Sequence, residues 1–317
     1  MFACCSAMQE LDYLPVGETI GGRWLVRDLI GEGAFGRVYA VTQWSDSAEC
    51  ALKLQKAKHE QNLANCLLHE TQVYLEVQRR SDKSASIPTM LDHGWLQLPT
   101  GYAKPLPYLV TERLGAGLDQ ILGWVEEDSC PADLSGRTLN LPTAFEYAKQ
   151  ILRSLQYLHN MGWVHRDVKP NNFALGLPPN QDRLYLFDFG RAHRFLTQHT
   201  GEWQEARVKV EYGGPLWYAS LNGHKKKEQG PHDDLQSLLY LTVRMCKGYL
   251  PWSHVLSVPC VYWLKRSTPI SVLYSNLPHQ LQHLQEYLQS LTYGQWPDYR
   301  LVTEGLDRCA DAVSSDC

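Results

Sequence analysis

The stretch VHRDVKPNNF, from Val164 to Phe173, constrains this chain more than any other part of its sequence. It places two basic side chains, one acid and two amides in a loop between apolar neighbours, where a structural turn would need only turn-forming residues. At a usage of about 5–7% per residue type, the pattern HRDxKxxN arises by chance at roughly one in a million starting positions. The loop therefore predicts a chemical site.

The groups in this loop are those that phosphoryl transfer to a hydroxyl requires. A carboxylate must orient the hydroxyl and take its proton, a cation must balance the departing charge, and an oxygen must bind magnesium. Asp167, Lys169 and Asn172 supply these three groups within one loop. Asp188, in the apolar segment LYLFDFG, adds a second hard oxygen ligand of the kind that magnesium prefers.

A glycine-rich turn near the N-terminus predicts a phosphate-binding hairpin. In GEGAFGRV, the glycines Gly31, Gly33 and Gly36 would let backbone N–H groups approach phosphates closely. In a dinucleotide-binding fold such a turn leads from a strand into a helix, whereas here RVYAV follows and favours a second strand. Taken alone, the turn could also be a plain tight β-turn.

Lys53 and Glu70 form a second candidate pair. Lys53 lies in the apolar segment ALKL, and a lysine in such a segment is rarely buried without a partner. Glu70, in the helical segment that follows, could pair with it and aim the ammonium at a phosphate. Taken singly, Lys53 is more typical of a solvated strand edge and Glu70 of an exposed helix acid.

Hydrophobic periodicity divides the chain into a small β-rich part and a larger helical part. The small part contains the expected strands RWLVRDLI, RVYAVTQ and CALKL and a helix from Leu63 to Val77, and it ends with the strand and connector PYLVTERLGAG. The larger part has a core helix from Pro142 to Met161 and a central apolar helix from Asp234 to Cys246, after a surface loop from Gly123 to Pro142. The predicted class is α+β, with an N-terminal extension (1–22), an N-lobe (23–111), a hinge (112–116), a C-lobe (117–309) and a short tail (310–317).

Composition narrows the partners and the compartment. The net charge of −4 argues against nucleic acid as a partner, because phosphate contacts need a basic excess. Nine cysteines without zinc-ligand spacing are typical of reduced thiols in a cytoplasmic or nuclear protein. No signal peptide or myristoylation signal is evident, and no apolar run approaches the length of a membrane span. We therefore expect a monomer with no membrane partner.

The ordered set of motifs resembles the signature of eukaryotic protein kinases. The set runs from the glycine turn and Val38 through Lys53 and Glu70 to HRDVKPNN and DFG, and the resemblance extends from about Arg23 to about Arg308. Where most kinases have an APE motif, this chain has GPLWYASLN, followed by HKKKEQGPHDDL. These segments resemble the casein kinase 1 group and are most similar to its tau-tubulin kinase branch.

The resemblance implies a two-lobed kinase fold that binds ATP and Mg²⁺ at the hinge, with a role for each matching residue. Asp167 would be the catalytic base, Lys169 would meet the γ-phosphate, and Asn172 and Asp188 would hold magnesium. Lys53, oriented by Glu70, would contact the α- and β-phosphates, and Asp234 would brace the catalytic loop. The nucleotide would also contact the hairpin glycines Gly31, Gly33 and Gly36, the adenine-packing residues Ile30, Val38 and Ala51, the gatekeeper Thr111, and the hinge residues Glu112 and Leu114.

A basic surface is the expected site for a substrate anion. Arg207 matches a position where the casein kinase 1 group carries a basic residue that binds an anion, often a phosphate already on the substrate. Lys209 and the run Lys225, Lys226 and Lys227 could widen this surface. A solvated charged loop is the alternative for these residues.

One position departs from the pattern. Kinases of this group usually have threonine after the glycine that matches Gly214, and its hydroxyl bridges the catalytic aspartate and lysine, whereas this chain has Pro215. Proline offers neither a hydroxyl nor an N–H group. Tyrosine kinases resemble this chain in having proline there, but they generally lack the lysine that matches Lys169. We therefore expect transfer to serine or threonine at a reduced rate.

The predicted function is transfer of the γ-phosphate of ATP to serine or threonine of protein substrates, with a preference for acidic or pre-phosphorylated ones. No further regulatory domain is expected, and basal activity should not need phosphorylation of the activation segment. Two alternatives remain: a pseudokinase scaffold that binds ATP but transfers little phosphate, and a small-molecule phosphotransferase of kinase-like fold. The second is disfavoured, because such enzymes usually lack both the lysine at Lys169 and the HDDL helix.

Overall fold

The computed structural model describes residues 13–33, 36–45, 48–56, 66–79, 86–98, 104–123 and 137–314. The start of the predicted N-terminal extension, the first turn of the helix predicted from Leu63 and most of the loop predicted after Gly123 lie outside these residues. The chain forms two compact units: Met1–Asp82 with Pro88–Leu114, and Lys83–Ile87 with Gly115–Cys317. The boundary after Leu114 falls inside the predicted hinge, and each unit is described by itself.

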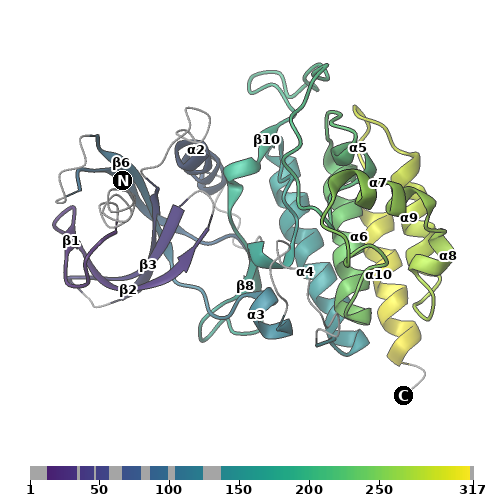
Figure 1. The fold of residues 1–317 in the computed structure, drawn as a ribbon, viewed down its shortest axis with the longest axis horizontal. Helices are drawn as coiled ribbons and strands as arrows, with labels where there is room; N and C mark the ends of the chain where they lie inside the picture. The colour runs from purple at the N-terminus through teal and green to yellow at the C-terminus, as the bar shows by residue number, and fades with distance from the viewer. Residues whose placement is uncertain are drawn as a thin grey trace, which may run out of the picture. The chain divides into compact units, whose positions relative to one another are not determined.

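The first unit is a six-stranded antiparallel sheet in the order β1-β2-β3-β4-β6-β5, with the helix α2 (Cys66–Gln78) packed on β5 and β6 (Figure 1). β5 was not among the expected strands. The strands are β1 (Thr19–Ile20), β2 (Trp24–Glu32), β3 (Gly36–Gln43), β4 (Glu49–Gln55), β5 (Met90–Leu96) and β6 (Leu106–Glu112).

The two faces of this sheet differ in burial. One face forms the core, with Tyr39 and Val41 of β3 beside Leu52 and Leu54 of β4. Burial of each such side chain contributes about 1.5–3 kcal/mol. The residues between them, including Val38 and Lys53, point to the other, half-buried face, because successive side chains of a strand alternate. The second face of the sheet is therefore only partly covered, and it carries the charged side chain of Lys53.

The second unit is mostly helical. In it α6 is buried almost all round and packs on α4 and α9, while α10 packs on α4 and α9; Figure 1 shows α4, α6 and α10 side by side. The helices are α3 (Leu118–Leu122), α4 (Leu141–Asn160), α5 (Leu221–His224), α6 (Pro231–Lys247), α7 (Val258–Ser267), α8 (Ile270–Leu273), α9 (Gln280–Ser290) and α10 (Tyr299–Ser314).

Two pairs of short strands and two 3₁₀ turns order the loops of the second unit that carry HRD and Asp188. β7 (Trp163–Val164) pairs with β10 (His193–Arg194), and β8 (Phe173–Leu175) pairs with β9 (Leu184–Leu186). The 3₁₀ turns η1 (Pro170–Asn172) and η2 (Phe189–Arg191) follow HRD and Asp188, respectively. Both predicted metal ligands therefore lie beside the β8–β9 hairpin.

The predicted α+β class, with a β-rich part and a mostly helical part, is confirmed. The predicted start of the central helix was wrong. The central helix begins at Pro231 rather than Asp234, because Asp233 accepts a hydrogen bond from the Gly230 N–H and closes the first turn. The tail predicted from Ala310 is helical to Ser314, because the apolar stripe of α10 continues to the buried Cys309.

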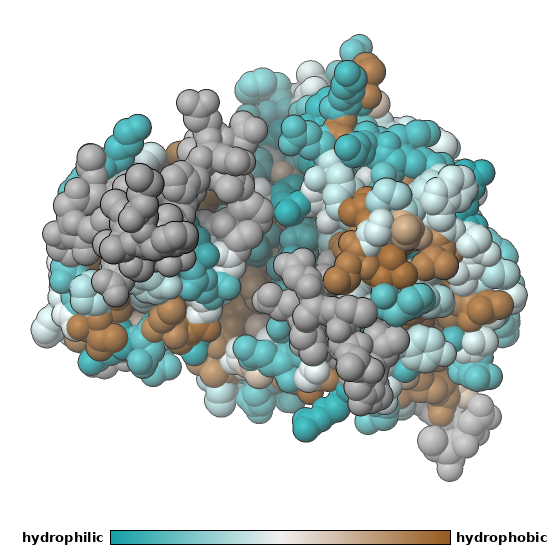
Figure 2. All heavy atoms as spheres, viewed as in Figure 1, coloured by the Kyte–Doolittle hydropathy of each residue, from teal (hydrophilic) through white to brown (hydrophobic). Residues whose placement is uncertain are grey.

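Figure 2 shows polar and apolar side chains intermixed on the visible surface, with hydrophobic patches among them. Among the described residues of the second unit, Val208 and Trp263 are the most exposed large apolar ones, at 96% and 60%. Within the described ranges, none of the helices has both the length and the apolar character needed to cross a membrane.

Candidate active site

The backbone of the loop that carries HRD is fixed by Asp234 at the start of α6. Its carboxylate accepts hydrogen bonds from the backbone N–H of His165 at 2.6 Å and of Arg166 at 2.9 Å. Arg166 has a left-handed backbone conformation, with φ 66°, which costs a non-glycine residue about 1–3 kcal/mol. The hydrogen bonds to Asp234 offset this cost, so Asp234 braces the loop as predicted.

Asp234 is itself held by a buried histidine. His159 Nε2 lies 2.9 Å from its carboxylate, and His159 Nδ1 lies 2.7 Å from the Tyr299 hydroxyl of α10. Burial opposes ionisation of Asp234, but the hydrogen bonds from His159 and from the loop backbone outweigh it and lower its pKa. The brace is therefore a charged acceptor connected to α4 and α10, and neither His159 nor Tyr299 was predicted from the sequence.

Asp167 lies at the centre of the loop with its carboxylate almost buried. Its Oδ2 atom is 3.3 Å from the Lys169 ammonium and accepts a hydrogen bond from the Asn172 amide at 3.2 Å. The same amide donates to the Asp167 backbone carbonyl at 2.6 Å. Arg191 Nε lies farther away, at 3.9 Å. The structure thus brings together the predicted base, the predicted phosphate cation and one predicted metal ligand.

Asn172 and Asp188 are brought close by the β8–β9 hairpin. The Phe187 N–H, one residue before Asp188, donates to the Asn172 carbonyl at 3.1 Å. Asp188 has a left-handed backbone, with φ 64°, as residues at functional sites often do. Because the amide nitrogen of Asn172 is directed at Asp167, its amide oxygen is the atom that could meet a cation.

These two residues fit Mg²⁺ by the chemistry of their oxygens. Among the described residues, no group of three or more His, Cys, Asp and Glu side chains could hold a metal ion. Mg²⁺, however, is commonly bound by one or two protein oxygens together with substrate phosphates and water. Asn172 and Asp188 provide one amide oxygen and one carboxylate, which matches that mode.

In the first unit, the predicted pair of Lys53 and Glu70 is present. The Lys53 ammonium lies 2.7 Å from the Glu70 carboxylate, and the two side chains are 20% and 4% exposed. A buried carboxylate is costly without such a partner, so the pair also anchors α2 to β4. The ion pair fixes the direction of the lysine on the half-buried face of the sheet.

The residues predicted to contact adenine lie near this lysine on the sheet. Val38 pairs with Lys53 across β3 and β4, and Ala51 pairs with Thr111 across β4 and β6, so all four share one face. Ile30 lies on the neighbouring strand β2. The last two predicted contacts, Glu112 and Leu114, are half-buried at the end of this unit, and the Glu112 N–H already donates to the Thr89 carbonyl at 2.9 Å.

The glycines of the hairpin have different roles. A Cβ atom at Gly36 would lie 2.7 Å from the Leu54 carbonyl, so this glycine is required by the close approach of β3 and β4. At Gly33 nothing lies within 4 Å of such an atom, which leaves space beside the backbone, and Gly31 has only Val38 nearby. The hairpin tip at residues 34–35 lies outside the described chain.

At the predicted anion site, Arg207 is paired with a buried acid, Glu228, for which no role was predicted. Arg207 donates two side-chain hydrogen bonds to Glu228, which is buried although it ends the charged run KKKE. Burial, together with the charge of Arg207, lowers the pKa of the nearby Arg166 guanidinium. Lys209 is exposed, as are the three lysines of the run, Lys225, Lys226 and Lys227, so these side chains are on the surface.

Comparison with known proteins agrees with this geometry. Residues 24–258 match the protein kinase domain. A probable serine/threonine-protein kinase of Dictyostelium discoideum is 30% identical over 303 residues, which cover 95% of this chain and 56% of that relative. The chain thus spans little more than half the length of this relative. The fold of this chain, the geometry of its catalytic loop and the match to the kinase domain show that the chain belongs to the protein kinase family.

Proposed function

We propose that this chain is a serine/threonine protein kinase, which transfers the γ-phosphate of ATP to a hydroxyl of a protein substrate. The observation that carries the proposal is the set of groups around one atom, Asp167 Oδ2, which has Lys169 at 3.3 Å and Asn172 at 3.2 Å. Membership of the kinase family and the similarity to a probable serine/threonine-protein kinase support it.

The residues of the catalytic loop divide the work of the reaction. Asp167 accepts a hydrogen bond from the substrate hydroxyl, orients it for attack and takes its proton as the new P–O bond forms. Lys169 balances the negative charge of the transferred group while the bond to ADP breaks. Since Lys169 also lies beside Asp167, it keeps that carboxylate in place between turnovers. Most of the rate enhancement comes from such charge stabilisation.

The remaining predicted residues bind the nucleotide. Asn172 and Asp188 would hold Mg²⁺, which supplies positive charge to the phosphates of ATP. Lys53, directed by Glu70, would contact the α- and β-phosphates. Each of these contacts would restrict the movement of the phosphate chain.

The finer assignment is to the casein kinase 1 group, near the tau-tubulin kinase branch, with acidic or pre-phosphorylated proteins as substrates. The segments GPLWYASLN and HKKKEQGPHDDL support the group. Arg207 supports the substrate preference, because only two of the five N–H groups of an arginine are needed for its contact with Glu228. The others could bind a phosphate or a carboxylate.

A second candidate is a scaffold that binds ATP and transfers little phosphate, and Pro215 favours it. Phosphate transfer from ATP to protein, compared between the chain and its Asp167→Asn variant, separates the two. Transfer that is lost in the variant supports the kinase. Stabilisation by ATP without transfer would support the scaffold.

A further inference from the structure

The short turn from Pro215 to Ala219 lies next to the catalytic loop. It is closed by a hydrogen bond from the Ala219 N–H to the Pro215 carbonyl at 2.9 Å. A Cβ atom on the preceding Gly214 would lie 3.1 Å from the Ala219 Cβ and 3.4 Å from the Arg166 carbonyl. Gly214 therefore fits between Ala219 and the residue before Asp167, so the position of Ala219 decides how closely the turn approaches the loop.

A buried cation holds this turn from the other side. Lys265 of α7 is 6% exposed, and its ammonium donates a hydrogen bond to the Ala219 carbonyl at 2.6 Å. The ammonium also lies 4.8 Å from the ring centre of Tyr240 and 5.2 Å from that of Trp252, where the aromatic faces stabilise its charge. A buried ammonium is retained only where it has such partners. The backbone of Ala219 is thus fixed at both its N–H and its carbonyl.

The ring that receives the ammonium binds the same turn. Trp252 Nε1 donates to the Trp217 carbonyl at 2.8 Å, and Trp217 Nε1 donates to the Val255 carbonyl at 3.0 Å. These indole groups hold the middle of the turn against the segment between α6 and α7. The contact of Lys265 with the end of the turn and the indole contacts with its middle therefore lie side by side through Trp252.

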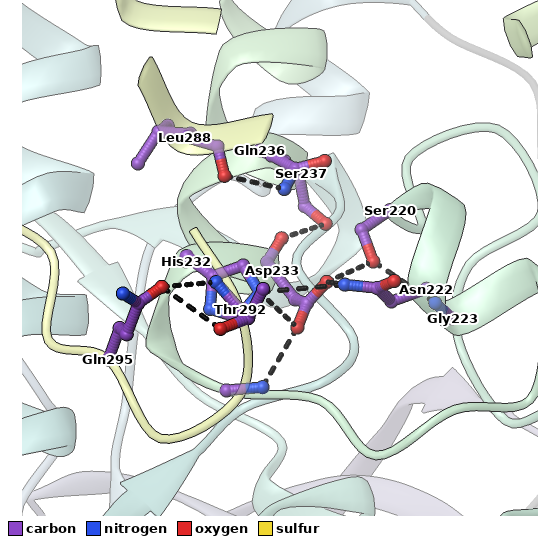
Figure 3. Close-up of polar contacts among 11 residues, drawn as sticks. Ser220, Asn222, Gly223, His232, Asp233, Gln236, Ser237, Leu288, Thr292 and Gln295 are labelled. Atoms are coloured by element: carbon purple, nitrogen blue, oxygen red, sulfur yellow. Dashed lines mark hydrogen bonds and ion pairs between the residues drawn. The ribbon is translucent and has the colours of Figure 1, made fainter. Parts of the chain in front are cut away.

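The residue after the turn is fixed by a buried carboxylate (Figure 3). Ser220 donates to Asp233 at 2.6 Å, and the same carboxylate accepts from Asn222 at 3.1 Å and from the Gly230 N–H at 2.8 Å. Ser220 also accepts a hydrogen bond from the Gly223 N–H, which caps α5. Consecutive residues, Ala219 and Ser220, are therefore attached to α7 and α6.

These anchors matter because Pro215 cannot form the hydrogen bond that a threonine hydroxyl would make to the catalytic loop. The position of the turn must then be set by its other contacts. We propose that Lys265 is a positioning residue: through the Ala219 carbonyl, its ammonium holds the Pro215–Ala219 turn against the catalytic loop and so sets where the acceptor hydroxyl of a protein substrate lies. This inference rests on the proposed kinase activity.

The test replaces Lys265 by methionine, which removes the ammonium but leaves an unbranched chain to pack on Tyr240 and Trp252. We expect kcat/KM for a peptide acceptor to fall by about ten- to a hundredfold, the usual effect of losing a charged hydrogen bond. ATP hydrolysis without a peptide, in which water is the acceptor, should be unchanged, as should the KM for ATP. Lys265→Arg, which keeps the charge and the donor, should recover most of the peptide transfer.

Lys247→Met is the matched control. Lys247 also donates to a backbone carbonyl, that of Leu273 at 2.9 Å, and to the Ser275 hydroxyl at 3.0 Å, and both acceptors lie outside the turn. This variant should keep full peptide transfer. If Lys265→Met does not fold, Lys265→Gln, which retains a neutral donor, takes its place in the same comparison.

Two results would overturn the proposal: peptide transfer unchanged in the Lys265 variant, or an equal loss of peptide transfer and of ATP hydrolysis. Amide hydrogen exchange provides a separate measure, since the Ala219 N–H should exchange faster in Lys265→Met and not in Lys247→Met. Absence of phosphate transfer by the unaltered chain would instead contradict the proposed function, and faster exchange at Ala219 would then still show the anchor.

Discussion

Arg207 is held by both carboxylate oxygens of the buried Glu228, with Nε–Oε2 at 2.5 Å and Nη2–Oε1 at 2.8 Å. Burial opposes ionisation of Glu228, but the hydrogen bonds from Arg207 outweigh it and lower its pKa. The carboxylate is therefore charged near neutral pH, and the guanidinium is fixed in one orientation. An anion that binds Arg207 meets a preorganised guanidinium, although Glu228 already balances part of the positive charge of that guanidinium.

Arg207→Ala should reduce the preference for a pre-phosphorylated peptide. We expect the ratio of kcat/KM values, primed over unprimed, to fall by about tenfold, since hydrogen bonds between charged groups are lost. Arg153→Ala is the control, because Arg153 is 60% exposed on α4 and lies 3.9 Å from Glu146. An unchanged ratio in Arg207→Ala would show that this arginine does not bind the substrate anion.

Lys53→Met should weaken ATP binding and lower the stability of the first unit. It removes the Lys53 ammonium from the buried Glu70 carboxylate, so the free energy of unfolding should fall by about 2–3 kcal/mol. The Kd for ATP should rise by about tenfold or more, because a charged contact to phosphate is lost. Urea denaturation and ATP titration measure the two effects.

The pair of Lys56 and Glu32 is a matched control for that experiment. Its N–O distance is also 2.7 Å, but the side chains are 25% and 36% exposed. Lys56→Met should therefore cost less than about 1 kcal/mol. If the two lysine variants lost the same stability, the pairing of Lys53 with Glu70 would have no special role.

Pro215→Thr should increase the rate of transfer. The new hydroxyl would supply the bridge between Asp167 and Lys169 that the resemblance implies, and we expect kcat to rise by about tenfold. Pro215→Ala relaxes the backbone in the same way without adding a hydroxyl, so its kcat should not rise. Equal effects of the two variants would mean that the backbone, not the hydroxyl, limits the rate.

His224 should make the protein less stable in mild acid. Burial and the nearby charge of Lys265 lower the pKa of His224 to about 3. The unfolded chain takes up a proton at this histidine below about pH 6.5, while the folded chain does not, so stability falls as the pH drops through this window. The slope should be up to about 1.4 kcal/mol per pH unit for this one group.

His224→Phe should remove that part of the slope. Phenylalanine keeps a ring that can stack on Tyr212, whose ring centre is 5.6 Å from that of His224. His283→Phe, at an exposed position of α9, should leave the slope unchanged. Urea denaturation at several pH values between 7 and about 4 measures the difference, and parallel curves for the native chain and His224→Phe would contradict the assignment.

The sequence was sufficient for the parts of the fold and site that depend on local pattern. Periodicity located β2, β3, β4, β6, α4 and α6, because each buries one regular stripe of apolar residues or is apolar all round. The spacing of HRDVKPNN was enough to name Asp167, Lys169 and Asn172 together, since all three lie in one loop. Glu70 was predicted as the partner of Lys53 because it lies in the helix that follows and matches the kinase signature.

The remaining features depend on contacts between distant residues, which local pattern does not encode. Glu228 directly follows the lysine run and no role was predicted for it, yet its carboxylate is buried against Arg207, 21 residues away. Lys265 lies in the last turn of a short helix, as lysines commonly do, but tertiary packing places its ammonium against Ala219. Strand β5 was missed because its sequence, MLDHGWL, contains a glycine and few strand-forming residues.

We propose that Asp167 acts in the transfer of phosphate to serine or threonine. The most direct measurement is transfer from labelled ATP with Mg²⁺ to a mixed acidic protein substrate, beside Asp167→Asn, with identification of the phosphorylated residue type. We predict phosphoserine or phosphothreonine that disappears in the variant. Phosphotyrosine would contradict the acceptor assignment, and no transfer, or transfer equal in the variant, would contradict the assignment of Asp167 itself.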